Sequence, residues 1–294
     1  MQKPFGYTLK INLSPSRSLL SLGPGWAALA GFLSTGYPTL TWSVVLQIIA
    51  LWILVDPILG TLWELTVNHR LWQQIRLAQL PPAPATGFTV PYAQTGSIAG
   101  RFVVKVRRYR RWWQETGWPE MGDKFVTFCL GIVLALLLGL ALTPTIFWLV
   151  VLAVGLTVLT GPTTSNLSTG GGGRIQSVVQ FLLPWLMGVL LAPNPSLVSV
   201  AAAICYWVVY LGGLRMLGGH RRAEWLFFGG QLALVVLLLA LHLLPGAAIL
   251  IVFLAAQLFI RTTFKQPADL LRKVQPFLVI GLIVAAVLLG GWLG

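Results

Sequence analysis

Residues 50–64 read Ala50-Leu-Trp-Ile-Leu-Val-Asp56-Pro57-Ile-Leu-Gly60-Thr-Leu-Trp-Glu64, and they close an apolar run that begins near Leu40. Asp56 is the only carboxylate well inside an apolar run, and beyond Glu64 the sequence opens into its one long polar segment. About 20 apolar residues in a helix cross the hydrocarbon core of a bilayer. The stretch therefore predicts a membrane-spanning helix over residues 40–66 that carries an acid and ends at a polar interface.

Comparable apolar runs recur along the whole chain. Of its 294 residues, 56% are hydrophobic and only 9% are charged, and the mean hydropathy is +0.82. This composition excludes an ordinary soluble domain. We predict an all-α polytopic membrane protein, a bundle of nine transmembrane helices over residues 26–35, 40–66, 125–142, 145–160, 175–191, 197–214, 225–244, 247–260 and 276–293.

The basic residues alternate from loop to loop. All 20 Lys and Arg fall in the N-terminal tail or in the loops after the second, fourth, sixth and eighth predicted spans. Cytoplasmic loops of membrane proteins carry such an excess of Lys and Arg. We therefore predict a cytoplasmic N-terminus, a C-terminus outside, and the bacterial cytoplasmic membrane as the location. Residues 1–23 are then a cytoplasmic tail, and residues 24–294 are one membrane domain with a cytoplasmic interfacial insert at 67–122.

The net charge of +13 follows from this topology and from attraction to anionic headgroups, so it does not call for nucleic acid as a partner. We expect membrane lipids and other membrane-protein subunits as partners instead.

The second half of the insert has an amphipathic pattern. Aromatic and aliphatic side chains recur at helical spacing over residues 98–117, with cations around the rest of the helix. Such a helix suits the plane of the membrane interface, and the alternative is a docking surface for a partner. The residues assigned to this interfacial or docking surface are Phe102, Val106, Tyr109, Arg111, Trp112 and Trp113.

Asp56 and Glu64 are the candidate catalytic or ion-binding residues. An acid at membrane depth is costly unless it faces the bundle interior and finds a partner, so such residues usually serve function. Glu64 lies about 80° around an α-helix from Asp56 and about 12 Å along it. The two could line one cavity but could not grip a single ion together. The structural alternative is that Asp56 is protonated or paired with an arginine.

A second candidate site is the basic loop after the sixth span. Arg215, His220, Arg221 and Arg222 could bind a phosphate or a lipid headgroup directly. The alternative is that they are ordinary charges of a cytoplasmic loop. The three histidines of the chain are scattered, so we expect no metal site.

Nine spans with an internal N-terminus and candidate sites after spans two and six resemble the UbiA-type membrane prenyltransferase superfamily. In that family, two Asp-rich motifs at the ends of helices 2 and 6 hold Mg²⁺ against an isoprenyl diphosphate. The first family motif, Asn-Asp-x-x-Asp-x-x-x-Asp, falls on Asp56–Glu64, where Pro57 and Gly60 replace the central acids. The second falls on residues 212–224, where the only acid is Glu224.

This departure decides the functional prediction. Mg²⁺ needs oxygen ligands, and a loop with three arginines repels it. We therefore predict a non-catalytic UbiA-like subunit or accessory factor of a larger membrane complex. No cofactor is expected, although a bound lipid or isoprenoid is compatible with this function.

Two alternatives stay open. One is a divergent prenyl or lipid transferase that uses Asp56, Glu64 and Mg²⁺. The other is a transporter that uses Asp56 as a proton or cation site, although the sequence offers no second intramembrane ionisable group and no obviously broken helix.

Overall fold

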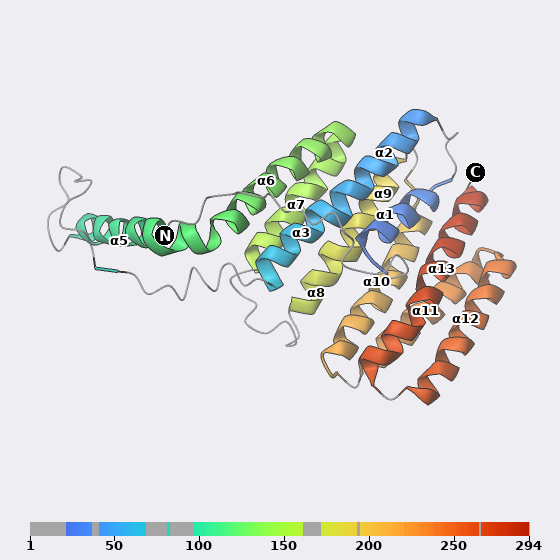
Figure 1. Cartoon of the computed structure of the whole chain (residues 1–294). Helices are drawn as coiled ribbons and strands as arrows, with labels where there is room; N and C mark the ends of the chain where they lie inside the picture. Colours follow the sequence, from blue (N-terminus) through green and yellow to red (C-terminus); the bar gives the residue numbers. More distant parts are fainter. Residues whose placement is uncertain are drawn as a thin grey trace, which may run out of the picture.

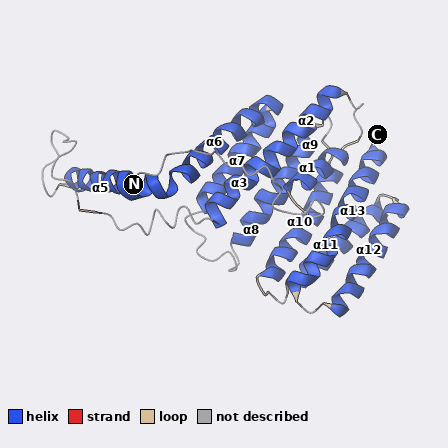
Figure 2. Ribbon diagram, in the orientation of Figure 1, coloured by secondary structure: helices blue, strands red, loops and turns tan. Residues whose placement is uncertain are grey.

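The computed structural model describes residues 22–36, 41–68, 81–82, 97–160, 172–192, 195–220, 222–264 and 266–293. All regular secondary structure in these ranges is helical (Figure 2). Nearly all of it gathers in one bundle, from which α5 extends to the left in Figure 1. In chain order, the elements are α1 (Pro24–Leu33), α2 (Trp42–Ile53), η1 (Leu54–Ile58), α3 (Leu59–Trp63), η2 (Glu64–Asn68), α5 (Ile98–Trp112), η3 (Trp113–Gly117), α6 (Trp118–Leu142), α7 (Pro144–Thr160), α8 (Gly172–Ser177), η4 (Val178–Leu182), α9 (Leu183–Leu191), α10 (Leu197–Leu217), α11 (Ala223–Ala240), α12 (Leu244–Thr263) and α13 (Pro267–Leu293), with π-turns marked η.

Within the described ranges, seven continuous helices are long and apolar enough to cross a membrane. They are Trp42–Thr66, Ile98–Leu142, Gly173–Leu191, Leu197–Leu217, Ala223–Ala240, Leu244–Thr263 and Pro267–Leu293. The protein is therefore an all-α integral membrane protein, as its composition predicted.

The described helices do not meet the predicted count of nine spans. The other two apolar helices are shorter, with 10 residues in α1 and 17 in α7. At a rise of 1.5 Å per residue, α1 is about 15 Å long, or about half of a hydrocarbon core. The sequence pattern could not show this, because apolar residues on either side of α1 extended the predicted span.

Helix α1 lies inside the bundle, against α9 and α13. Seven of its ten residues are buried, and most of them are small. Three glycines allow this close approach. A Cβ atom on Gly31 would overlap the carbonyl oxygen of Trp185, one on Gly188 that of Ala28, and one on Gly290 that of Leu33. Small residues are what brings membrane helices together, because lipid removes the hydrophobic drive for association.

Three of the long helices contain a π-turn next to a proline. Pro57 lies inside η1, while Pro119 and Pro184 each follow a π-turn by two residues, η3 and η4. A proline cannot donate to the carbonyl four residues earlier, and its ring collides with that carbonyl in an α-helix. In the wider turn an amide near the proline bonds five residues back, as Leu59 does to Leu54 and Leu183 to Val178.

The Lys and Arg residues of the described helices outside α5 lie at or near one end of the bundle, which we call the basic end. It is made of the starts of α6, α8, α11 and α13 and the ends of α10 and α12, at the lower left of Figure 1. The residues concerned are Lys124, Arg174, Arg215, Arg222, Arg261, Arg272 and Lys273. The opposite end carries no Lys, Arg, Asp or Glu in the described ranges.

Candidate functional site

Asp56 lies in the π-turn η1, and Glu64 is the first residue of the second π-turn η2. Both side chains are half-buried. Element η1 contacts both α1 and α6, so the turn that holds Asp56 lies where three helical segments meet. A π-turn adds about one residue to a helical turn, so the 80° offset expected for an unbroken α-helix does not carry over to this pair.

The described residues do not assemble a metal-binding cluster around these acids. No three His, Cys, Asp or Glu side chains in that part of the chain come close enough together to hold an ion. In the described residues, neither Asp56 nor Glu64 therefore has the further acidic ligands of the family motif that the sequence resembles.

The basic loop after α10 is a tight helix end. Gly219 has a φ of +78°, and the amide of His220 donates to the carbonyl of Arg215. This is a Schellman arrangement, which satisfies the last carbonyls of the helix. Arg215 is half-buried, His220 and Arg222 are exposed, and Arg221 lies outside the described residues.

Glu224 does not neutralise the arginines of its own loop. It forms an ion pair with Arg261 at the end of α12, and the Arg261 guanidinium lies 5.8 Å from the ring centre of Phe228. Within the described ranges, Arg215 and Arg222 take part in no ion pair. The loop therefore keeps a net positive charge that faces the basic end.

Helix α5 forms with η3 an arm outside the bundle (Figure 1). Its side chains are strongly exposed, with Phe102 at 68%, Val106 at 47% and Tyr109 at 37% of their full accessible surface. A hollow of ≈ 590 Å³ runs along this face of the arm. Its lining residues are Phe102, Lys105, Val106, Tyr109, Arg110, Trp112 and Trp113.

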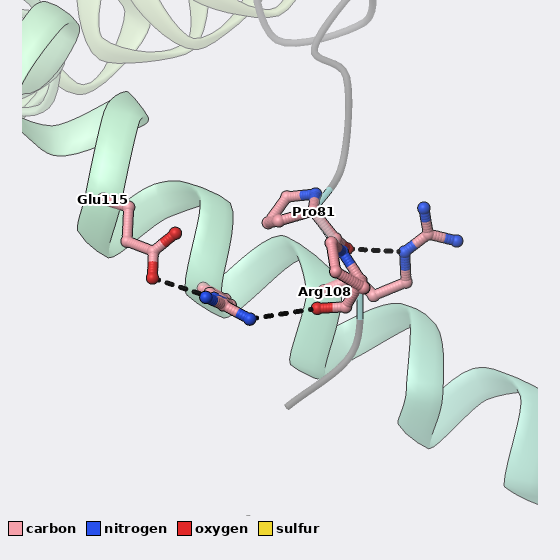
Figure 3. A network of polar contacts seen from close by, with 5 residues as sticks. Pro81, Arg108 and Glu115 are labelled. Atoms are coloured by element: carbon pink, nitrogen blue, oxygen red, sulfur yellow. Dashed lines mark hydrogen bonds and ion pairs between the residues drawn. The ribbon is translucent and has the colours of Figure 1, made fainter. Parts of the chain in front are cut away.

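The polar side of the arm is held by local contacts (Figure 3). The Arg111 guanidinium donates to the Glu115 carboxylate at 2.8 Å, one turn along the helix. Arg108 donates to the carbonyl oxygen of Pro81 at 2.9 Å. Arg111 reaches the neighbouring carbonyl of Pro82 at 3.5 Å, at the outer limit of a hydrogen bond.

The two tryptophans assigned to the docking surface lie at the joint between the arm and α6. Trp112 is only 7% exposed, and its ring lies 6.0 Å from that of Trp113. Trp113 makes edge-to-face contacts with Phe125 at 5.2 Å and Trp118 at 6.1 Å. These contacts stabilise the joint at η3, so the exposed apolar residues of the predicted docking surface are Phe102, Val106 and Tyr109.

A polar network around η4 was not predicted from the sequence. Gln180 is 5% exposed, and its side-chain oxygen accepts from Tyr210 at 3.0 Å and from Gln176 at 3.1 Å. One turn away, the indole of Trp207 donates to the Ser177 hydroxyl at 2.9 Å. Element η4, which carries this network, and element η1, which carries Asp56, both contact the short helix α1. The sequence feature that could have indicated this network is Pro184, which lies in an otherwise apolar span.

A second missed group lies between α11 and α12. The side-chain amides of Gln231 and Gln257 donate to each other, at 3.0 and 2.9 Å. They border a small cavity whose other lining residues are Tyr206, Leu234, Leu250, Phe253, Phe277, Leu278 and Gly281. Single polar residues in two separate apolar runs carry no sign in sequence that they will meet.

Comparison with known proteins adds no relative to this description. No protein-family model, no curated protein and no solved structure matches the chain.

Proposed function

We propose that the protein is a non-catalytic integral subunit or accessory factor of a larger membrane complex, and that the α5 arm is its docking element. The observation that carries this proposal is the uncovered amphipathic face of the arm. Among the described elements, α5 makes an extended contact only with η3. A short helix with an apolar face gains most of its stability from whatever covers that face. The arm is therefore built to be covered by something outside this bundle.

The positive charge of the arm indicates the charge of the surface that would cover it. Residues 101–111 hold six cations, and Glu115 is the nearest acid on the helix. Exposed aromatic side chains among cations fit an acidic surface at headgroup depth. We propose that this surface belongs to an acidic partner subunit at the membrane. Anionic lipid is the alternative occupant, and the experiment must distinguish the two.

We further propose that the basic end faces the cytoplasm, with the C-terminus outside. The location we propose is the bacterial cytoplasmic membrane. Support comes from the one-sided distribution of Lys and Arg, which is the best predictor of orientation in the membrane. The relationship to UbiA-type proteins stays part of this proposal, and it is supported only by the layout of helix pairs and the position of the Asp56 segment.

The test is the native mass of the full chain, extracted from its own membrane in mild detergent, with mass spectrometry of what migrates with it. The arm offers a matched pair of variants: Val106 on the aromatic face is 47% exposed, and Val104 on the other side of the helix is 45% exposed. Val106→Asp should release the partner, because it puts a carboxylate into the docking face, while Val104→Asp should keep it.

Two results would contradict the proposal. One is a lone chain in a small micelle for the wild-type protein. The other is equal loss of the partner in both variants, since that would point to a general effect of the new charge. Co-migrating anionic lipid without protein, lost in Val106→Asp, would assign the arm to the membrane surface instead.

A transporter is the second candidate, because two membrane helices carry irregular turns that the sequence did not show. These helices contain the π-turns η1 and η4, and both turns contact the half-length helix α1. π-turns inside helices are frequent at functional sites. Asp56-dependent flux of protons or cations in proteoliposomes would favour this candidate, and equal flux in wild type and Asp56→Asn would remove it.

The transferase alternative has its own test. It requires Mg²⁺-dependent binding of an isoprenyl diphosphate that is lost in Asp56→Asn.

A further inference from the structure

The cavity beside the Gln231–Gln257 pair lies deep in the bundle. Gln231 is the ninth of 18 residues in α11 and Gln257 the fourteenth of 20 in α12, so the pair is well away from either helix end. Gln257 is 1% exposed and Tyr206, which borders the cavity from α10, is 2% exposed. The Gln257 amide and the Tyr206 hydroxyl are therefore shielded from outside water in the packed bundle, while Gln231 is half-buried.

Two hydrogen-bond donors at this cavity have no partner among the described residues. The Tyr206 hydroxyl makes no hydrogen bond to the part of the chain that the structure describes. A glutamine amide has two N–H donors, and Gln257 uses one of them, on Gln231. Gln231 has no free amide N–H, because its side-chain nitrogen also donates to the carbonyl oxygen of Phe227 at 3.4 Å. Buried donors are almost always satisfied, by protein or by ordered water.

The size of the cavity selects the missing partner. Its volume is ≈ 10 Å³, and its remaining lining is apolar. About 10–15 Å³ on this measure is the least that holds one water molecule, and such a water needs two to four polar partners. Larger molecules do not fit, and an apolar occupant would leave both donors unpaired.

We propose that this cavity binds one water molecule, which accepts from the Tyr206 hydroxyl and the free N–H of Gln257 and ties α10 to the α11–α12 pair. The water then completes a polar clamp across three membrane helices. Gly281 of α13 forms the fourth wall. A Cβ atom there would lie 3.6 Å from the Tyr206 hydroxyl and 3.1 Å from Leu250, so an alanine would compete with the water for the space.

The thermal unfolding of the full chain distinguishes a wet cavity from a dry one by the sign of the Tyr206→Phe effect. If water is bound, Tyr206→Phe removes one of its hydrogen bonds and the Tm falls. If the cavity is dry, the same change deletes an unsatisfied hydroxyl and the Tm rises. Gly281→Ala lowers the Tm in either case, because its methyl group lies 3.1 Å from Leu250, so the sign test rests on Tyr206→Phe alone.

Tyr210→Phe is the matched control, because it lies one turn further on α10 and its hydroxyl donates to Gln180 at 3.0 Å. We expect a lower Tm for all three variants, with the fall for Tyr206→Phe similar to that for Tyr210→Phe. We also expect a density peak within hydrogen-bond distance of both Tyr206 Oη and Gln257 Nε2 in a map that resolves waters. An empty cavity in such a map, or a raised Tm for Tyr206→Phe, overturns the proposal.

Discussion

At the scale of single residues, two helix ends share one backbone motif but differ in the residue that makes the turn. At the end of α10 the left-handed position is Gly219, with φ +78°, and at the end of α11 it is His242, with φ +60°. In both, the next amide donates five residues back, from His220 to Arg215 and from Leu243 to Leu238. The left-handed conformation costs a residue with a Cβ atom about 1–2 kcal/mol.

We therefore expect His242→Gly to raise the free energy of unfolding by about 1 kcal/mol, measured by reversible unfolding in mixed SDS micelles. His242 is exposed, so little packing is lost. Gly219→Ala is the opposite change at the matched position, where an added Cβ meets no other atom within 4 Å. It should lower the unfolding free energy by a similar amount. A destabilised His242→Gly protein would mean that the imidazole makes a contribution larger than the backbone strain.

At the scale of elements, the position of α1 depends on glycine contacts with its neighbours. Gly188 of α9 faces the carbonyl of Ala28 and the amide of Phe32, and these are backbone atoms that cannot move aside alone. A methyl group at Gly188 must therefore push α1 away from α9. Because α1 is only 10 residues long and largely buried, it cannot be held by its own helical hydrogen bonds.

Gly188→Ala should therefore lower the unfolding free energy by about 3 kcal/mol, at the upper end of the usual cost of overpacking. Gly155→Ala in α7 is the control, since nothing lies within 4 Å of its added Cβ. That change should stabilise the helix by about 0.5–1 kcal/mol, because alanine loses less backbone entropy than glycine. Equal effects of the two changes, measured under the same conditions, would argue against the close α1–α9 contact.

At the scale of the whole molecule, the bundle has one basic end and one end without charged side chains in the described ranges. This one-sided charge distribution predicts that the basic end faces the cytoplasm. Leu217 at the basic end is 58% exposed, and Leu244 at the other end is 63% exposed. The two leucines are therefore matched positions for a test of orientation.

We expect Leu244→Cys, but not Leu217→Cys, to react with a membrane-impermeant maleimide added to intact cells, and both to react after lysis. The two native cysteines, Cys129 and Cys205, are first replaced by alanine, because Cys129 is exposed. Labelling of Leu217→Cys alone in intact cells would reverse the proposed orientation.

The sequence by itself determined the class of this protein and the approximate positions of most of its long helices. The predicted span at 197–214 lies within α10, and that at 276–293 is the C-terminal part of α13, which begins earlier, at Pro267. Apolar runs report directly on the solvent that surrounds a segment, so they can be read one at a time. The apolar side chains at helical spacing over residues 98–117, with cations around the rest, likewise predicted an amphipathic helix, and the structure has the helix α5 there.

Only the tertiary structure decided which segments meet. The position of α1 against α9 and α13 depends on the close approach that Gly31, Gly188 and Gly290 allow, and no local pattern encodes which segments these glycines will meet. The same holds for Gln231 and Gln257, which are 26 residues apart and acquire their partners only when α11 lies against α12. Hydrophobic periodicity indicates whether a residue is surrounded by lipid, water or protein. Which helices pair is set instead by the shapes of their surfaces and by the need of polar groups for hydrogen-bond partners, which lipid does not provide.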